Sequence, residues 1–210
     1  LTPGNPAYCY SVDWSPDGSR LVVGGYEAIY ILDTDNWGGN RTIQNAFSTL
    51  NSVQYSPDGN MISACSAWGG SDARARVYNA MTGAQEWSYT TSTSCNDAAW
   101  SPDSSQVAFT HTYYRSDGAS INIFFAGTGV KLDTLSAPRP GGCTSSGGGN
   151  NCGTIYGIDW HQDGNHIISA HSRNDEGVYH WLVDPDMDND GYLNPDDAFP
   201  EDGTQWNDTD

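Results

Sequence analysis

The stretch Val12-Asp13-Trp14-Ser15-Pro16-Asp17-Gly18 decides the fold, because the chain repeats it. It returns as Val53-Gln54-Tyr55-Ser56-Pro57-Asp58-Gly59, as Ala98-Ala99-Trp100-Ser101-Pro102-Asp103-Ser104 and as Ile158-Asp159-Trp160-His161-Gln162-Asp163-Gly164. The central aromatic residues lie 41, 45 and 60 positions apart. Periods near 40 to 45 residues, with several short strands in each unit, are typical of β-propeller blades. The sequence therefore predicts an all-β propeller with four blade-like repeats.

Each repeat predicts the same series of strands. A first strand runs into a turn, where Pro presets φ and Asp-Gly allows a tight reversal. Second strands are expected at 20–24, 61–65, 106–110 and 166–170, and third strands at 28–32, 75–78, 121–124 and 178–181. Fourth strands are expected at 85–90 and 130–135, with a weaker signal near 42–47. The fourth repeat lacks this outer strand, because the chain there enters an acidic tail.

The repeated phrase resembles the WD-repeat family, with its aromatic residue, Ser-Pro-Asp-Gly turn and aromatic-Asp pair. Leu32-Asp33 and Tyr78-Asn79 stand where that family has Trp-Asp, whereas its Gly-His dipeptide is absent. The same turn is equally typical of TolB-like propellers, so the subfamily stays open. The resemblance implies a propeller over residues 1–183 but no particular activity, since repeated residues mainly hold blades together.

The predicted blades span about 8–48, 49–92, 93–138 and 153–183. Three arrangements follow from four blades, which is the lower end of the usual range. The chain closes a four-bladed ring, two chains form one larger ring, or the blades are part of a longer polypeptide.

The charge of the chain is strongly acidic and unevenly placed. Its 210 residues carry 26 acidic and 8 basic side chains, for a net charge of -18. From Asp184 onwards there are ten acidic residues and no basic one. This balance argues against nucleic acid as a partner and indicates that the extension 184–210 binds cations.

A twelve-residue calcium loop is readable within this extension. Oxygen donors recur at loop positions 1, 3, 5, 9 and 12, Gly191 stands at position 6, and Tyr192 offers its carbonyl at position 7. The predicted calcium ligands are Asp186, Asp188, Asp190, Tyr192, Asn194 and Asp197. The loop departs from the helical EF-hand, since position 12 is Asp, Pro195 interrupts it and no amphipathic helix flanks it. The following Asp-Ala-Phe-Pro-Glu-Asp at 197–202 instead resembles thrombospondin type 3 repeats, where the resemblance implies that calcium is a structural staple.

Five cysteines suggest disulfides. Cys143 and Cys152 bracket a Gly/Ser/Asn loop and are expected to pair locally. Cys65 on the second strand of blade two and Cys95 on the first strand of blade three are expected to link these blades. Cys9 is then free, or paired with another chain or with further sequence.

This cysteine usage favours an oxidising, extracellular or cell-surface setting. Two glycosylation sequons begin at Asn40 and Asn207. No apolar run reaches the length of a membrane span.

We expect no enzyme, because the chain shows no nucleophile elbow, no separate carboxylate pair and no phosphate-binding loop. Four histidines gather in the fourth repeat at 161, 166, 171 and 180. Strand alternation places His166 and His171 on opposite faces, so we interpret them as ordinary polar positions rather than as a zinc site.

The sequence thus predicts a calcium-stabilised structural or adhesive module that binds proteins, including copies of itself in an oligomer or fibre, or glycans. Long insertions with Trp68, Tyr113 and Tyr114 are the expected contact surface. The alternative is the non-catalytic propeller domain of a larger secreted hydrolase or carbohydrate-binding protein. An intracellular WD-type scaffold would conflict with the calcium loop and the cysteines.

Overall fold

The computed structural model describes residues 8–26, 28–37, 41–44, 49–66, 74–90, 94–111, 119–136, 154–172 and 177–183. Within these ranges the chain forms fifteen strands in four antiparallel sheets. The described ranges contain no helix that could cross a membrane.

Each sheet is one blade, and the strands follow one another in chain order. Blade 1 contains β1 (Cys9–Trp14), β2 (Arg20–Gly25), β3 (Ala28–Asp33) and β4 (Arg41–Gln44). Blade 2 contains β5 (Leu50–Tyr55), β6 (Met61–Ser66), β7 (Arg74–Asn79) and β8 (Gln85–Thr90). Blade 3 contains β9 (Ala98–Trp100), β10 (Gln106–His111), β11 (Ser120–Phe125) and β12 (Lys131–Ser136). Blade 4 contains β13 (Thr154–Trp160), β14 (His166–Ser172) and β15 (Gly177–Leu182).

The predicted strands are confirmed, with ends that differ by one or two residues except at the weakly signalled fourth strand of blade 1. That strand is described from Arg41 to Gln44, and the expected positions 45–47 lie outside the described residues. Blade 4 has three strands among the described residues, and the positions after 183, where an outer strand would follow, lie outside them.

The repeated turn closes by side-chain hydrogen bonds. In blade 1 the Ser15 hydroxyl donates to Asp17 at 2.7 Å, and the amide of Ser19 donates to the same carboxylate at 2.9 Å. The turn ends on a left-handed residue, which is Gly18 here, with a φ of 70°. Blade 3 has Ser104 at this position, with a φ of 66°, and its hydroxyl accepts the Asp58 amide of blade 2 at 3.0 Å. This bond between blades offsets part of the backbone strain.

One cluster of buried apolar residues joins blades 1 and 2 around Val22 and Val53, a second joins blades 2 and 3 around Cys65 and Trp100, and a third joins blades 3 and 4. The predicted disulfide Cys65–Cys95 is confirmed within the second cluster, with a Cα–Cα distance of 5.3 Å. Cys9 is exposed and has no disulfide partner among the described residues.

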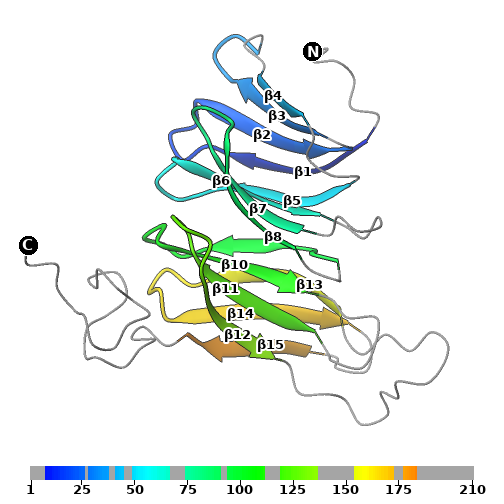
Figure 1. The fold of residues 1–210 in the computed structure, drawn as a ribbon, viewed down its shortest axis with the longest axis vertical. Helices are drawn as coiled ribbons and strands as arrows, with labels where there is room; N and C mark the ends of the chain where they lie inside the picture. The colour runs from blue at the N-terminus through cyan, green and yellow to red at the C-terminus, as the bar shows by residue number, and fades with distance from the viewer. Residues whose placement is uncertain are drawn as a thin grey trace, which may run out of the picture.

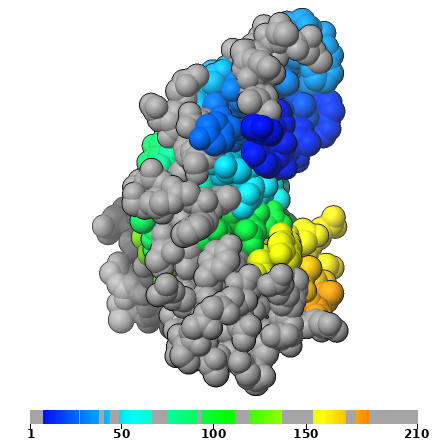
Figure 2. Space-filling model, turned by 90° about the vertical axis from the view of Figure 1, so that its right-hand side faces the viewer, coloured from blue at the N-terminus to red at the C-terminus, as the bar shows by residue number. Residues whose placement is uncertain are grey.

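The four blades form an open arc. The innermost strands pack in sequence, β1 on β5, β5 on β9 and β9 on β13. Both views place blade 1 at one end of the long axis and blade 4 at the other (Figures 1 and 2). Among the described residues, no strand of blade 1 makes a comparable contact with blade 4. Of the three arrangements open from the sequence, this arc is not a closed four-bladed ring.

Several predictions fall outside the described residues and stay predictions. These are the calcium loop 186–197, the pair Cys143 and Cys152, the sequons at Asn40 and Asn207, and the aromatic residues Trp68, Tyr113 and Tyr114.

Candidate interaction surface

The two ends of the arc expose apolar faces. We call the side of a blade that looks toward the next blade in sequence its forward face, and the opposite side its rear face. The forward face of blade 4 is formed by Asp159, His166, Ile168, Ala170, Val178, His180 and Leu182. The rear face of blade 1 is formed by Val12, Trp14, Leu21 and Val23 on its inner strands, and by Ala28, Tyr30 and Leu32 on its third strand, where the side chains are buried.

The forward face of blade 4 exposes positions that the other blades bury. Ile168 is 46% exposed, although its equivalents in blades 1 to 3 are fully buried. Val178 is 70% exposed, and its equivalents are fully buried as well. The buried equivalents of Ile168 are Val22, Ser63 and Ala108, and those of Val178 are Ile29, Ala75 and Ile121. This end of the arc therefore exposes positions that the other three blades bury against a neighbouring blade.

The rear face of blade 1 shows the complementary pattern. Val12 is 61% exposed and Trp14 is 53% exposed, whereas the equivalent residues of the other three blades are buried. Those equivalents are Val53, Ala98 and Ile158 for Val12, and Tyr55, Trp100 and Trp160 for Trp14. Trp37 stands edge-on to Trp14, with the ring centroids 6.4 Å apart. Exposed aromatic and branched side chains of this kind mark interaction surfaces.

Hydrogen bonds between consecutive blades follow a repeated rule. A side chain at the repeat position of Ser11 accepts a backbone amide of the next blade: Ser11 accepts the amide of Val53, and Asp97, just before β9, accepts the amide of Ile158, both at 3.0 Å. Two residues further on, Asp13 accepts the amide of Tyr55 at 2.8 Å. Asp159 is the blade 4 residue at the repeat position of Asp13, and it is exposed at the open end.

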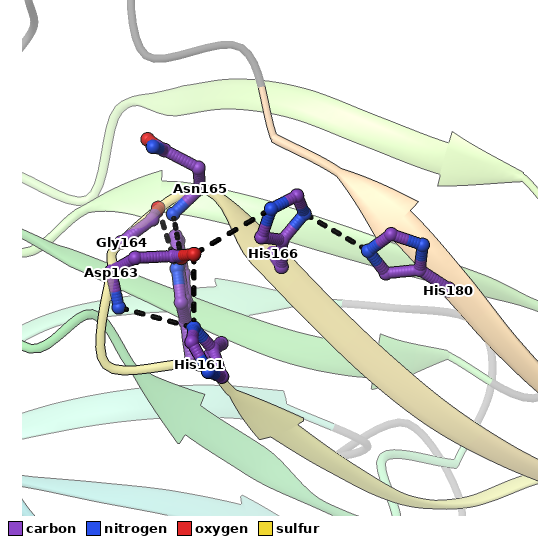
Figure 3. Close-up of polar contacts among 7 residues, drawn as sticks. His161, Asp163, Gly164, Asn165, His166 and His180 are labelled. Carbon is purple, nitrogen blue, oxygen red and sulfur yellow. Dashed lines mark hydrogen bonds and ion pairs between the residues drawn. The ribbon is translucent and has the colours of Figure 1, made fainter.

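A string of polar contacts crosses the forward face of blade 4 (Figure 3). Nε2 of His180 lies 2.9 Å from Nδ1 of His166, and Nε2 of His166 lies 3.5 Å from the Asp163 carboxylate. The same carboxylate lies 3.0 Å from Nδ1 of His161. Hydrogen bonds lower the pKa of Asp163, first that from the Asn165 amide and then that from His161. At the 2.9 Å contact one ring nitrogen donates and the other accepts.

In the described ranges, no group of three or more His, Cys, Asp or Glu side chains is arranged to hold a metal ion. His171 lies apart, on the rear face, where Nε2 is 2.8 Å from the Ser169 hydroxyl and the ring packs on Tyr179. The predicted placement of His166 and His171 on opposite faces is confirmed. The sequence did not indicate that the turn would bring Asp163 between His161 and His166.

A cavity of about 620 Å³ opens between the repeated turns of blades 1 and 2. Ser15, Asp17, Arg20, Asp58 and Asn60 are among the residues that line it. The turn hydrogen bonds engage both aspartates, which explains why their pKa values are lowered rather than raised. Both aspartates that line the cavity therefore serve in the repeated turns.

The repeats can be compared with a known family. The family model of the WD domain, G-beta repeat, matches residues 2–30, 40–79 and 141–181, which is more than half of the chain. The chain belongs to the WD-repeat family. The match leaves out the third blade of this WD-repeat chain, the blade in which Ser104 replaces the turn glycine. A search of the curated proteins found no match.

Solved structures support the same fold. The hydrazine synthase of Kuenenia stuttgartiensis is similar with a TM-score of 0.64 at 16% identity, over 78% of this WD-repeat chain. The aligned part covers 43% of the hydrazine synthase chain. At this identity the likeness concerns the fold alone.

The repeats revealed the blades, but not the surface that the arc leaves open. Every repeat carries the same apolar positions, so no local signal distinguishes Val12 or Ile168 from its buried equivalents. Exposure at these positions depends on which blade has a neighbour.

Proposed function

We propose that this chain is a non-enzymatic module of an extracellular or cell-surface assembly, which binds protein partners through the two open faces of its arc. WD-repeat propellers are protein-interaction folds, which supports a protein as partner. The observation that carries the proposal is the exposure of Val12, Trp14, Ile168 and Val178 at positions that every internal blade interface buries.

The cysteines support the proposed location. The disulfide Cys65–Cys95 joins two blades, and such links persist in oxidising compartments. Calcium bound at residues 186–197 would add a cation-stabilised extension to the module, as the acidic sequence there suggests.

Site-specific photo-crosslinking tests the proposed interaction. A photoreactive amino acid replaces Ile168 in one protein and Val130 in another, and each is mixed with the surface and secreted proteins of the source organism. Val130 is an exposed apolar residue between β11 and β12, away from both open faces, and serves as the control. We expect position 168 alone to give one dominant adduct, identified by peptide mass and suppressed by excess unlabelled chain. Equal or absent labelling from both positions would contradict the proposed function.

A further inference from the structure

We infer that a second copy of this chain covers both open faces. Blade 4 of each copy packs on blade 1 of the other, and the two chains close one eight-bladed ring. This inference rests on the proposed function, since it names the partner of the same two faces.

The first argument is that each open face matches a face already buried within the chain. A forward face packs on a rear face three times, at the boundaries of blades 1 and 2, 2 and 3, and 3 and 4. The arc leaves one forward face and one rear face without such a neighbour. Stacking blade 4 of one copy on blade 1 of another would repeat an interface that this sequence forms three times.

The contacts of blades 1 and 2 indicate which residues would meet. A Cβ built on Gly24 would lie 3.0 Å from Cγ1 of Val53, so these two positions face each other across that boundary. Ala170 holds the repeat position of Gly24, and Val12 holds that of Val53. Ala170 of one copy is therefore expected to face Val12 of the second copy.

The polar contact at this boundary has its counterpart as well. Asp13 accepts the amide of Tyr55 within the chain. Asp159 and Trp14 hold the same two repeat positions at the open ends. Within one chain the Trp14 amide donates to the Asp13 carboxylate at 2.9 Å, so in the ring this amide would be shared with, or transferred to, the carboxylate of Asp159 of the second copy.

Two copies are the smallest number of chains that would close a ring. Eight blades lie within the common propeller range of about four to eight. In a ring with two-fold symmetry both contacts between copies are identical, and no open face remains. A head-to-tail contact with a different rotation would instead build an open filament.

Sedimentation equilibrium of the full 210-residue chain in Ca²⁺ buffer tests the inference. The expected species has twice the 22.7 kDa mass of one chain. Val12→Glu and Ala170→Lys each introduce one charge into the expected contact and should raise the dissociation constant at least about tenfold. The double variant places Glu opposite Lys and should recover much of this loss, whereas the control Val130→Glu should leave the constant unchanged.

The outcomes separate this inference from the proposed function. A monomer with crosslinks from position 168 to another identified protein would overturn the inference and leave the proposed function standing. A monomer without such crosslinks would overturn both. Oligomers that grow with concentration would overturn the two-copy ring. Far-UV circular dichroism and the thermal midpoint of each variant show that it is folded, so loss of the dimer cannot be mistaken for loss of the fold.

Discussion

At the scale of single residues, Gly129 is required both by the left-handed backbone conformation at its position and by the Trp87 ring packed against it. Its φ is 73°, and an added Cβ would collide with the Trp87 indole. That ring cannot easily move away, because Nε1 donates to the Ala126 carbonyl at 2.6 Å and the ring packs on Phe124.

Gly129→Ala should therefore lower the free energy of unfolding by about 3 kcal/mol, through left-handed strain plus overpacking. Gly18→Ala provides the matched control, since its φ is 70° and nothing lies within 4 Å of the added methyl group. It should cost only about 1 kcal/mol, from the backbone alone. Urea unfolding of both variants measures the difference, and equal losses would contradict the role of Trp87.

The aspartates of the repeated turns make the free energy of unfolding depend on pH, and Asp103 is an example. Burial alone would raise the pKa of Asp103, but hydrogen bonds from Ser101 and Ser105 outweigh it, so the pKa is lowered. Ionised Asp103 therefore stabilises the fold above the unfolded value of about 3.9, and this stabilisation is lost as the pH falls through the folded pKa.

Asp103→Asn should cost about 1 kcal/mol of unfolding free energy at pH 7, a figure limited by the partial exposure of the carboxylate. The difference from the wild type should shrink as the pH falls below about 4. Glu86→Gln removes a charge from the exposed part of β8 and controls for the net charge of the chain. Urea unfolding at pH 7 and at pH 3 makes the comparison, and a difference independent of pH would refute the assignment.

At the scale of elements, the disulfide Cys65–Cys95 links β6 to the segment before β9 and closes a loop of 30 residues. Closing such a loop restricts the unfolded chain and stabilises the fold by about 3 kcal/mol. The double variant Cys65→Ala, Cys95→Ala should lose about this amount in denaturant unfolding, and Cys9→Ser should lose nothing. Equal stabilities of the double variant and the wild type would show that the blades hold together by packing alone.

The calcium loop 186–197 is the element whose prediction rests on the sequence alone. Isothermal titration should show Ca²⁺ binding to the wild-type chain. Asp188→Asn combined with Asp190→Asn should abolish it, because two of the oxygen anions are lost. Asp202→Asn, outside the loop, should leave binding intact. A heat of Ca²⁺ binding that persists in the double variant would show that the ion binds elsewhere and would contradict the predicted ligands.

Elements were predictable because a turn and its strands are local. The Ser-Pro-Asp-Gly turn fixed where β2 and β6 begin, and the confirmed starts at Arg20 and Met61 follow from it. The sequence signal for β4 was weaker than for β2 and β6, because no Ser-Pro-Asp-Gly turn precedes β4. The disulfide could be predicted from repeat positions, because Cys65 on β6 lies beside the segment before β9 that carries Cys95 in the next blade.

At the scale of the whole molecule, the sequence left three arrangements open. Whether blades 1 and 4 meet depends on the rotation between successive blades, and no single repeat records that rotation. The histidine string likewise depends on the pairing of β14 with β15, which brings His180 beside His166 across 14 residues.

Net charge governs how two such molecules approach. Each copy carries -18, so copies repel at low ionic strength, whereas the faces that would meet expose Val12, Trp14, Ile168 and Val178. Screening shortens the range of repulsion from about 30 Å at 0.01 M salt to about 3 Å at 1 M, while apolar burial is not weakened by salt. The dissociation constant of the two-copy ring should therefore fall with rising NaCl at constant Ca²⁺, on the order of tenfold over this range. Sedimentation equilibrium at several salt concentrations measures the trend. A constant that rises with salt would mean that ion pairs, and not the apolar faces of blades 1 and 4, hold the copies together.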